Sequence, residues 1–395
     1  MLKNRHIPFL TWLLISTMLL MIAACNSSDE EEMQEGGTDK KSAMLAIYVY
    51  APEQAAAAQK NAAHTRADVG KVDIISAAER EIKSLQLWIY ESGTGKYVGY
   101  LSTNEVTSLN KGEGITYQIP VSDEFAANKP NVDVYVQANV TADNCGVDES
   151  KLNEETTRSY LEEYGAKINT GYFGLSELVK NIPAKGLPMA GKLTTQTVVG
   201  DAPALRVGTE LQVSTVSLTR AVSKLRFVFA KTKDQPKVSI TSIKMDAEMI
   251  PDEEYLFKTP VSMTYNTEAK ELLSTPIEDI AETEDPTEYL YIDQEAQAYE
   301  NLINEAASKQ TPEVTVEGPI YLRESDKQLT GTISYTIEGG DEQTVVFAMQ
   351  QAGDFKRNHT WIVYVYYAGS GNLQIQSLYV KNWGNKVMTY NPYNW

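Results

Sequence analysis

The sequence contains few of the residues that carry most enzyme chemistry. It has 3 His among 395 residues, and His6, His64 and His359 are scattered along the chain. These are too few for a zinc site or a histidine-based triad. Its 2 Cys, Cys25 and Cys145, cannot provide a disulfide framework for a chain of this length. We therefore expect no metal, no other cofactor and no catalysis.

Positive charge is also scarce. The chain has 35 Lys and Arg against 53 Asp and Glu, a formal net charge of -18. Such a chain repels phosphates, so nucleic acid is not expected as a partner. The apolar fraction of 42% is high enough for a folded protein, and the length allows two domains. An excess of 23 Tyr over 8 Phe and 5 Trp suits half-exposed β surfaces.

The first 25 residues are typical of an export signal. A basic start precedes the apolar stretch 7–24, and Ala24 stands directly before Cys25. This pattern resembles the lipobox of bacterial lipoproteins. The resemblance implies that the signal peptide, residues 1–24, is removed and that Cys25 carries lipid (palmitate), which anchors the chain to a membrane. A transmembrane anchor is the alternative, because the apolar stretch approaches spanning length.

Residues 25–42 form an acidic tether, with Asp29–Glu32 as its most acidic part. The order of Ser residues followed by acidic ones also resembles the export signal of surface lipoproteins in the Bacteroidetes. If Cys25 carries lipid, Cys145 is a single thiol. We expect Cys145 to be a buried structural residue rather than a catalytic thiolate, because no His is a clear partner for it.

The rest of the chain is typical of short strands, in two series. Ala43–Tyr50 is rich in β-branched and aromatic residues, and Val132–Val140 alternates apolar with polar residues. Lys386–Tyr390 is a further short strand. In a strand at Val222–Ala230 we expect Leu225, Phe227 and Phe229 to face inward. The other expected strands are Ile82–Tyr90, Leu211–Leu218, Val222–Ala230, Val238–Met249, Leu329–Ile337, Thr344–Gln350, Thr360–Tyr367 and Leu373–Val380, and the expected helical insertions are Ser150–Tyr164 and Leu175–Asn181.

Short, regularly spaced, alternating strands favour antiparallel sheets. We therefore predict an all-β protein of two β-sandwich domains, residues 43–205 and 206–395, with short helical insertions. The boundary is expected in the stretch Gly191–Gly208, which contains Gly and Pro.

The order of several landmarks resembles the FimA-like fimbrillins, the major subunits of the type V pilus of Bacteroidetes. The resemblance spans essentially the whole chain, although each motif is loose. Besides the lipobox and the strand before an Arg-containing loop, the landmarks are Arg80–Leu85, Val134–Asn139, Leu218–Leu225 and Trp383.

The resemblance implies that both domains are transthyretin-like β-sandwiches and that the chain is an outer membrane lipoprotein exported to the cell surface. There an Arg-specific surface protease removes the N-terminal part with the first strand, and a strand of a neighbouring subunit fills the vacated groove. Such a subunit joins a fimbrium, or pilus. Its partners would be other copies, accessory subunits, the outer membrane before processing, and an unidentified host or bacterial receptor in cell adhesion.

Carried onto this sequence, the scheme predicts cleavage between Arg66 and Ala67. Arg66 lies in a stretch of small and polar residues in which extended chain can enter a protease. Arg80 is the alternative site, disfavoured by the following Glu81, and Arg66 as an ordinary loop charge is a further reading. Cleavage at Arg66 would release residues 43–66, whose strand carries Met44, Leu45, Ile47 and Val49.

The C-terminal tail, residues 373–395, is the expected donor in donor-strand exchange. Its apolar residues would enter the groove in alternation. The alternative is that these strands complete the chain's own second domain. The candidate donor residues are Leu378, Val380, Val387 and Trp395.

Two other functions have to be considered. A tip or accessory fimbrial adhesin would need no donor strand, because nothing lies beyond a tip in the fibre. A glycan-acting surface lipoprotein would need only two suitably spaced carboxylates. Acidic runs such as Asp252–Glu254 are more typical of solvated surfaces, and nothing in the sequence singles out an acid and a base.

Overall fold

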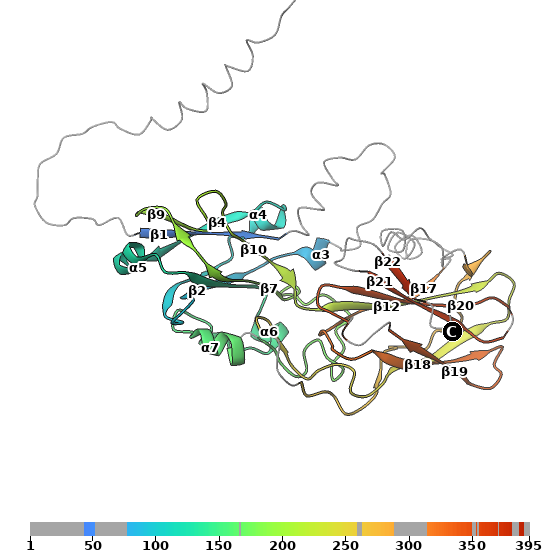
Figure 1. Ribbon diagram of the computed structural model, residues 1–395. Coiled ribbons are helices and arrows are strands. Elements are labelled where there is room, and N and C mark those ends of the chain that lie inside the picture. Colours follow the sequence, from blue (N-terminus) through green and yellow to red (C-terminus); the bar gives the residue numbers. More distant parts are fainter. Residues whose placement is uncertain are drawn as a thin grey trace, which may run out of the picture. The chain divides into compact units, whose positions relative to one another are not determined.

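The computed structural model describes residues 43–51, 77–165, 167–258, 263–287, 314–349, 353, 355–369, 371–380 and 387–390, which belong to one compact unit. The following predicted features lie outside the described residues: the signal peptide, Cys25, the tether, Arg66, Ala67, Trp383 and Trp395. Strands are the main regular secondary structure of the described chain and the helices are short, which confirms the predicted all-β class (Figure 1).

Two sheets form the first half of the chain. One has the order β10-β1-β9-β8, with β4 paired to the other edge of β1, and the other has the order β11-β7-β5-β2-β3. Alternating apolar residues explain both, since each sheet buries one face against the other. The strands are β1 (Ala43–Tyr50), β2 (Leu85–Glu91), β3 (Tyr97–Thr103), β4 (Ile115–Val121), β5 (Val132–Ala138), β7 (Met189–Gln196), β8 (Val198–Val199), β9 (Ala204–Val207), β10 (Thr215–Ser217) and β11 (Thr219–Arg220).

Two further sheets form the second half. One has the order β16-β12-β20-β21-β22 with β17 paired to β12, the other the order β15-β13-β18-β19, and a small sheet joins β14 to β6. The strands are β6 (Lys167–Ile168), β12 (Ser223–Thr232), β13 (Val238–Met245), β14 (Glu254–Tyr255), β15 (Lys270–Glu271), β16 (Glu282–Thr283), β17 (Thr315–Leu322), β18 (Thr330–Ile337), β19 (Gln343–Ala348), β20 (Thr360–Tyr367), β21 (Gln374–Val380) and β22 (Val387–Tyr390).

The helical elements with defined bounds among the described residues are short. They are α3 (Ala77–Arg80), α4 (Thr107–Asn110), α5 (Asp123–Asn128), α6 (Ala142–Cys145) and α7 (Arg158–Tyr160), with a 3-10 turn η1 (Glu149–Lys151) and a π-helical turn η2 (Leu161–Gly165). The predicted helix Ser150–Tyr164 is therefore broken. In the interruption the side chains of Asn153 and Thr156 hydrogen-bond to the backbone and compete with a helical ladder.

Three hydrophobic clusters hold the described residues together. The first joins the two sheets of the first half and includes Leu45 and Val134. The second joins the two sheets of the second half and includes Phe227, with Leu225 and Phe229 on the same inward face as predicted. The third draws on both halves, so the halves share a buried interface. For this reason β5, expected to have one polar face, is buried on both faces.

The second predicted helix, Leu175–Asn181, does not form. Its backbone is irregular, and Val179 makes an antiparallel bridge to Tyr321. Phe173 and Leu175 are buried in two different clusters. Anchoring on both sides holds this segment in an irregular, bent course that a helix cannot follow.

Two further expectations are wrong. The sheets are mixed, because β1 runs parallel to β9 and β10, and β12 runs parallel to β20. The expected boundary between residues 205 and 206 falls within β9, which pairs with β1. The sheets of the first half extend past the predicted boundary as far as β11, because Arg220 of β11 pairs with Met189 of β7. Long-range pairing overrides the local Gly and Pro signal here.

Candidate functional site: the first strand and its surroundings

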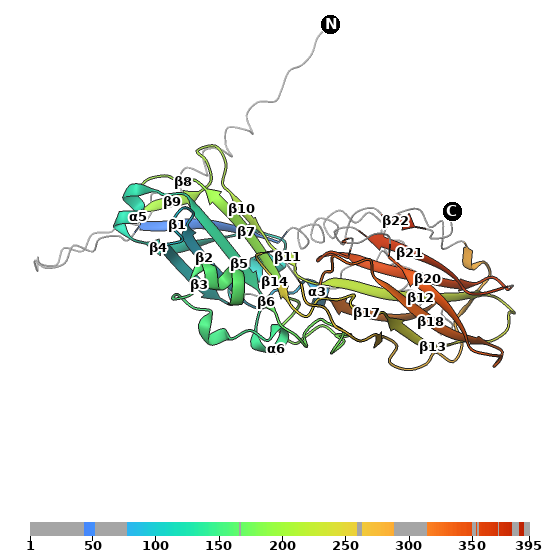
Figure 2. The ribbon, with the colours of Figure 1, turned by 60° about the horizontal axis from the view of Figure 1, so that its bottom comes forward.

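The first strand, β1, occupies an interior position in its sheet. It pairs antiparallel with β4 from Ala43 to Val49, and parallel with β9 and β10 on its other edge. Both ends are held further, since Met44 N donates to the Pro203 carbonyl at 2.7 Å and Leu218 N donates to the Tyr50 carbonyl at 2.9 Å. Figure 2 shows β1 in blue among these partners. Removing β1 would leave two unpaired strand edges.

The alternate side chains of β1 fill the space between the two sheets. Ala43, Leu45, Ile47, Val49 and Ala51 are each at most 1% exposed and belong to the cluster of the first half. Met44, predicted as one of this set, is half-buried on the opposite face. At about 1.5–3 kcal/mol for each large side chain, Leu45, Ile47 and Val49 together contribute roughly 4–9 kcal/mol. The site is thus a groove shaped for three large side chains with a small one at each end.

The chain returns to the described structure at α3, where Glu79 is 2% exposed. Its carboxylate accepts a hydrogen bond from the Tyr321 hydroxyl at 2.8 Å and lies 3.1 Å from Nζ of the buried Lys224. The Glu79 carbonyl accepts a hydrogen bond from Nε of the buried Arg220 at 2.9 Å. Burial and the neighbouring Glu79 raise the pKa of Tyr321, so the phenol stays protonated and donates. These contacts attach α3 to β11, β12 and β17.

This attachment separates two parts of the N-terminal region. In the described structure, strand pairing and apolar burial hold residues 43–51. Buried polar contacts fix the chain from α3 onward. Arg80, the alternative cleavage site, lies in α3 between the buried Glu79 and the buried Ile82. A protease needs extended chain, so cutting at Arg80 requires α3 to detach first. Among the described residues, Arg80 is therefore poorly placed for cleavage while α3 is folded.

We predict that Glu79→Ala lowers the free energy of unfolding by about 3 kcal/mol, because the substitution removes the buried ion pair with Lys224 and the hydrogen bond from Tyr321. Urea denaturation followed by tryptophan fluorescence measures the change. The matched control is Glu81→Ala, since the Glu81 side chain is 50% exposed and pairs with Lys83 at the surface. Surface pairs contribute at most about 1 kcal/mol, so equal effects of the two substitutions would contradict the assigned role.

The four predicted donor residues are distributed over two strands and the undescribed end of the chain. Leu378 and Val380 lie in β21, which pairs along its length with β20. Val387 lies in β22, which pairs with β21 at the edge of the sheet. Trp395 lies outside the described residues. Within the described part of the chain, β22 can therefore leave its sheet without opening the β20–β21 pairing, whereas β21 cannot.

The residues considered for catalysis serve the fold instead. Cys145 is fully buried, and burial raises the pKa of its thiol, which disfavours the thiolate. The Nδ1 atom of His359 lies 2.7 Å from the Arg357 carbonyl oxygen, a hydrogen bond within the local backbone turn.

The acidic run Asp252–Glu254 is not a solvated surface as a whole. Glu254 is 2% exposed and lies 2.8 Å from Arg357, and Glu253 lies 2.7 Å from Lys167. Glu253 and Glu254 thus each have their own basic partner, as in structural ion pairs.

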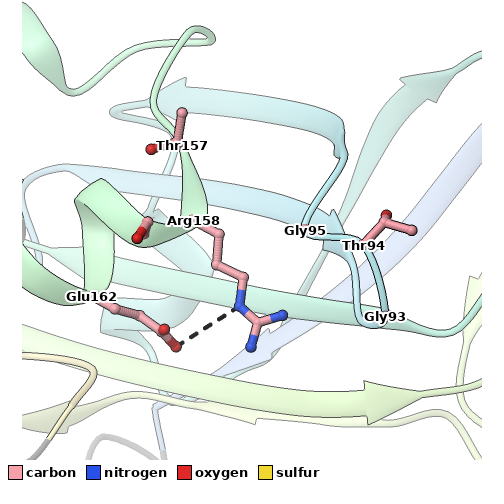
Figure 3. A pocket seen from close by; sticks show the side chains of 7 residues that line it. Gly93, Thr94, Gly95, Thr157, Arg158 and Glu162 are labelled. Carbon is pink, nitrogen blue, oxygen red and sulfur yellow. Dashed lines mark ion pairs between the residues drawn. The ribbon is translucent and has the colours of Figure 1, made fainter.

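A polar pocket of about 350 Å3 lies between the β2–β3 turn and α7, and Arg158 and Glu162 line it (Figure 3). Arg158 lies 2.7 Å from the buried Asp133 and donates to the Ser92 carbonyl at 3.0 Å. Glu162 accepts hydrogen bonds from Tyr135 and Lys192 at 2.7 and 2.8 Å. The charges of Arg158 and Glu162 are thus compensated by neighbouring groups. These contacts fix α7 against the β2–β3 turn, which is a structural role.

Among the described residues, no group of three or more His, Cys, Asp or Glu could hold a metal ion. No helix in the same residues is long and apolar enough to cross a membrane.

Neither a family model nor a curated protein matches the sequence. Among solved structures, the tip fimbrial protein Mfa3 of Porphyromonas gingivalis with a C-terminal truncation is 12% identical, with a TM-score of 0.47, covering 86% of this chain and 99% of that chain. The fimbrial anchor protein Mfa2 of the same organism is 10% identical, with a TM-score of 0.42, covering 88% and 100%. A fimbrial assembly protein from Parabacteroides distasonis is 13% identical, with a TM-score of 0.39, covering 88% and 99%.

Proposed function

We propose that this chain is a structural subunit of a cell-surface fimbria that polymerises when its first strand is exchanged for a strand of a neighbouring subunit. The observation that carries the proposal is the position of β1, the first described element. It fills an interior place in a sheet, and in the described structure only the chain after Ala51 connects it to the next element, α3. One cut in that connection turns an integral strand into a removable one.

The energetics agree with such an exchange. Held by roughly 4–9 kcal/mol of apolar burial, β1 stays bound while it is covalently attached and protects the groove. After cleavage it loses the high effective concentration of an attached segment. A strand of similar pattern from another copy then replaces β1 at little net cost, because it recovers the same burial and backbone pairing.

The processing site and the route to the surface come from the sequence. We assign cleavage to Arg66–Ala67, consistent with the helical setting of Arg80 in α3 beside the buried Glu79. Lipid on Cys25 holds the precursor at the outer membrane until an Arg-specific surface protease releases it into the fibre. In this role the chain binds other copies and accessory subunits, supports adhesion to a receptor, and performs no catalysis.

The donor is assigned to β22 and the residues that follow it. As the edge strand β22 is attached through β21 alone within the described residues, so its departure leaves β12, β20 and β21 paired. Val387 and Trp395 then enter the neighbour's groove. Leu378 and Val380 keep the donor connected to its own subunit through β21.

Mass spectrometry of the protein extracted from the cell surface tests the proposal. We expect an N-terminus at Ala67 in the assembled form, and a ladder of multimers when samples enter an SDS gel without heating. A surface form that retains β1 and runs only as a monomer would contradict a polymerising role.

A tip or accessory adhesin is the second candidate function. It is favoured by the pairing of β21 and β22 with the chain's own sheet, which is the arrangement of a subunit that donates no strand. Mixing the purified processed chain with itself separates the two candidates. Self-assembly into ladders identifies a stalk subunit, whereas a chain that binds only other subunits is a tip or accessory one.

A further inference from the structure

The strands β9 and β10 accompany β1 as one parallel strand with a single interruption. β9 pairs with Met44–Ala46, and β10 pairs with Tyr48–Tyr50. Opposite Ile47 the chain leaves the sheet and returns, and residues 208–214 make this excursion, which we call the β9–β10 hairpin.

The hairpin has a defined geometry. Ser214 N donates to the Val207 carbonyl at 3.0 Å, while Thr209 N donates to the Gln212 carbonyl at 2.7 Å and Gln212 N donates back at 3.3 Å. A two-residue tip is left at Glu210–Leu211. Gly208 at the base has φ +135°, and a Cβ there would lie 2.2 Å from the Gln212 carbonyl oxygen. Only glycine fits at this point.

Side chains brace the hairpin against the body of the protein. The Arg206 guanidinium donates to the Glu210 carbonyl at 2.8 Å and to the Thr209 carbonyl at 3.4 Å. The Ser214 hydroxyl donates to Gln196 at 2.7 Å. A braced hairpin loses little conformational freedom when it binds, so an apolar group at its tip is well suited to an interface.

Two apolar side chains at or near the tip of the hairpin are exposed. Leu211 is 99% exposed and Val213 41% exposed, and among the described residues only Tyr97 and Val346 are other large hydrophobic side chains of this exposure. A single exposed apolar residue is ordinary at a protein surface. Leu211 and Val213, however, are two exposed apolar residues within three positions, on a braced hairpin beside the groove. The fold of the monomer does not explain their exposure.

We propose that the β9–β10 hairpin is a second contact between successive subunits, in which Leu211 and Val213 pack on the body of the copy that supplies the exchanged strand. This rests on the proposed function. An eight-residue strand is about 26 Å long, so the excursion at its midpoint lies about 13 Å from either end. A donor body that begins at β12 has about 170 residues and a radius of gyration of about 16 Å, so a body attached at either end reaches the hairpin.

A thiol footprint tests the contact. The chain from residue 26 onward lacks Cys25, and its remaining Cys145 is fully buried with a raised pKa, so an introduced thiol is the reactive one. We expect Leu211→Cys to react with maleimide at least about tenfold more slowly in the polymer formed after Arg-specific proteolysis than in the uncleaved monomer. Val346→Cys, at an exposed site in β19, serves as the matched control and should react equally in both forms.

Assembly kinetics provide the second measurement. Leu211→Asp should leave the melting temperature of the monomer unchanged, because the side chain is in solvent, yet slow polymerisation about tenfold. Val346→Asp should change neither the melting temperature nor the rate of polymerisation. Equal maleimide rates for Leu211→Cys in monomer and polymer, or equal protection at both cysteines, would overturn the contact while leaving strand exchange intact. Failure of the unmodified processed chain to polymerise would overturn both proposals.

Discussion

Replacing Arg66 with Ala is expected to abolish polymer formation while leaving a folded monomer on the cell surface. In the uncut chain β1 stays in the groove, where five alternate positions are buried and both edges are paired. An incoming strand would then compete with an intramolecular one of high effective concentration. Electron microscopy and unheated SDS gels of surface extracts measure the loss of fibres and ladders.

The matched control for this experiment is Arg80→Ala. Arg80 lies in α3 beside the anchored Glu79, so its loss should leave processing and assembly as in the unmodified chain. The reverse outcome, with fibres lost in Arg80→Ala and retained in Arg66→Ala, would move the cut to α3. Fibres of normal length from both variants would refute proteolytic release of β1.

Deleting Lys386–Trp395 is expected to give a soluble monomer that ends growing fibres. The truncated chain keeps β21 paired with β20, so its own sheet survives, and it keeps a groove that accepts a strand. It lacks β22 and all that follows. Added to polymerising full-length protein at a tenth of its amount, it should shorten fibres severalfold, as electron microscopy would reveal.

A deletion that begins earlier supplies the contrast. Removing residues 373–395 also takes away β21 and the buried Leu373 and Ile375, which are 2% and 3% exposed. The free energy of unfolding of that chain should be lower by at least about 3 kcal/mol, since two buried apolar side chains and a ladder of hydrogen bonds are lost. Should the shorter deletion assemble into ladders like the full chain, β22 and the tail are not the donor, and the tip or accessory function becomes the better one.

Several elements could be predicted from local pattern alone. Thr360–Tyr367 matches β20 at both ends, and Ala43–Tyr50 matches β1 at both ends. Inward Leu225, Phe227 and Phe229 are confirmed in β12. Strand alternation and β-branched composition are properties of a few consecutive residues, so they can be recognised without knowledge of the partner strand.

The failures share a different cause. The sheets are mixed rather than antiparallel, and the boundary at residues 205 and 206 falls inside β9, because β1 selects partners more than 150 residues away. Periodicity identifies the face that a strand buries, but not the strand beside it or its direction. The predicted helix Leu175–Asn181 fails for a similar reason, since Val179 pairs with distant Tyr321.

The sequence by itself determined that this is an acidic chain of short alternating strands, and local pattern alone located β1 and β20. Tertiary structure alone decided that β1 lies between strands on both edges, and that Glu79 joins Lys224 and Tyr321. A lone Glu near a short helix gives no signal of this role. Its burial is tolerated only because basic and hydroxyl partners 145 and 242 residues further along the chain meet it in the folded protein, and such compensation is a property of the assembled core.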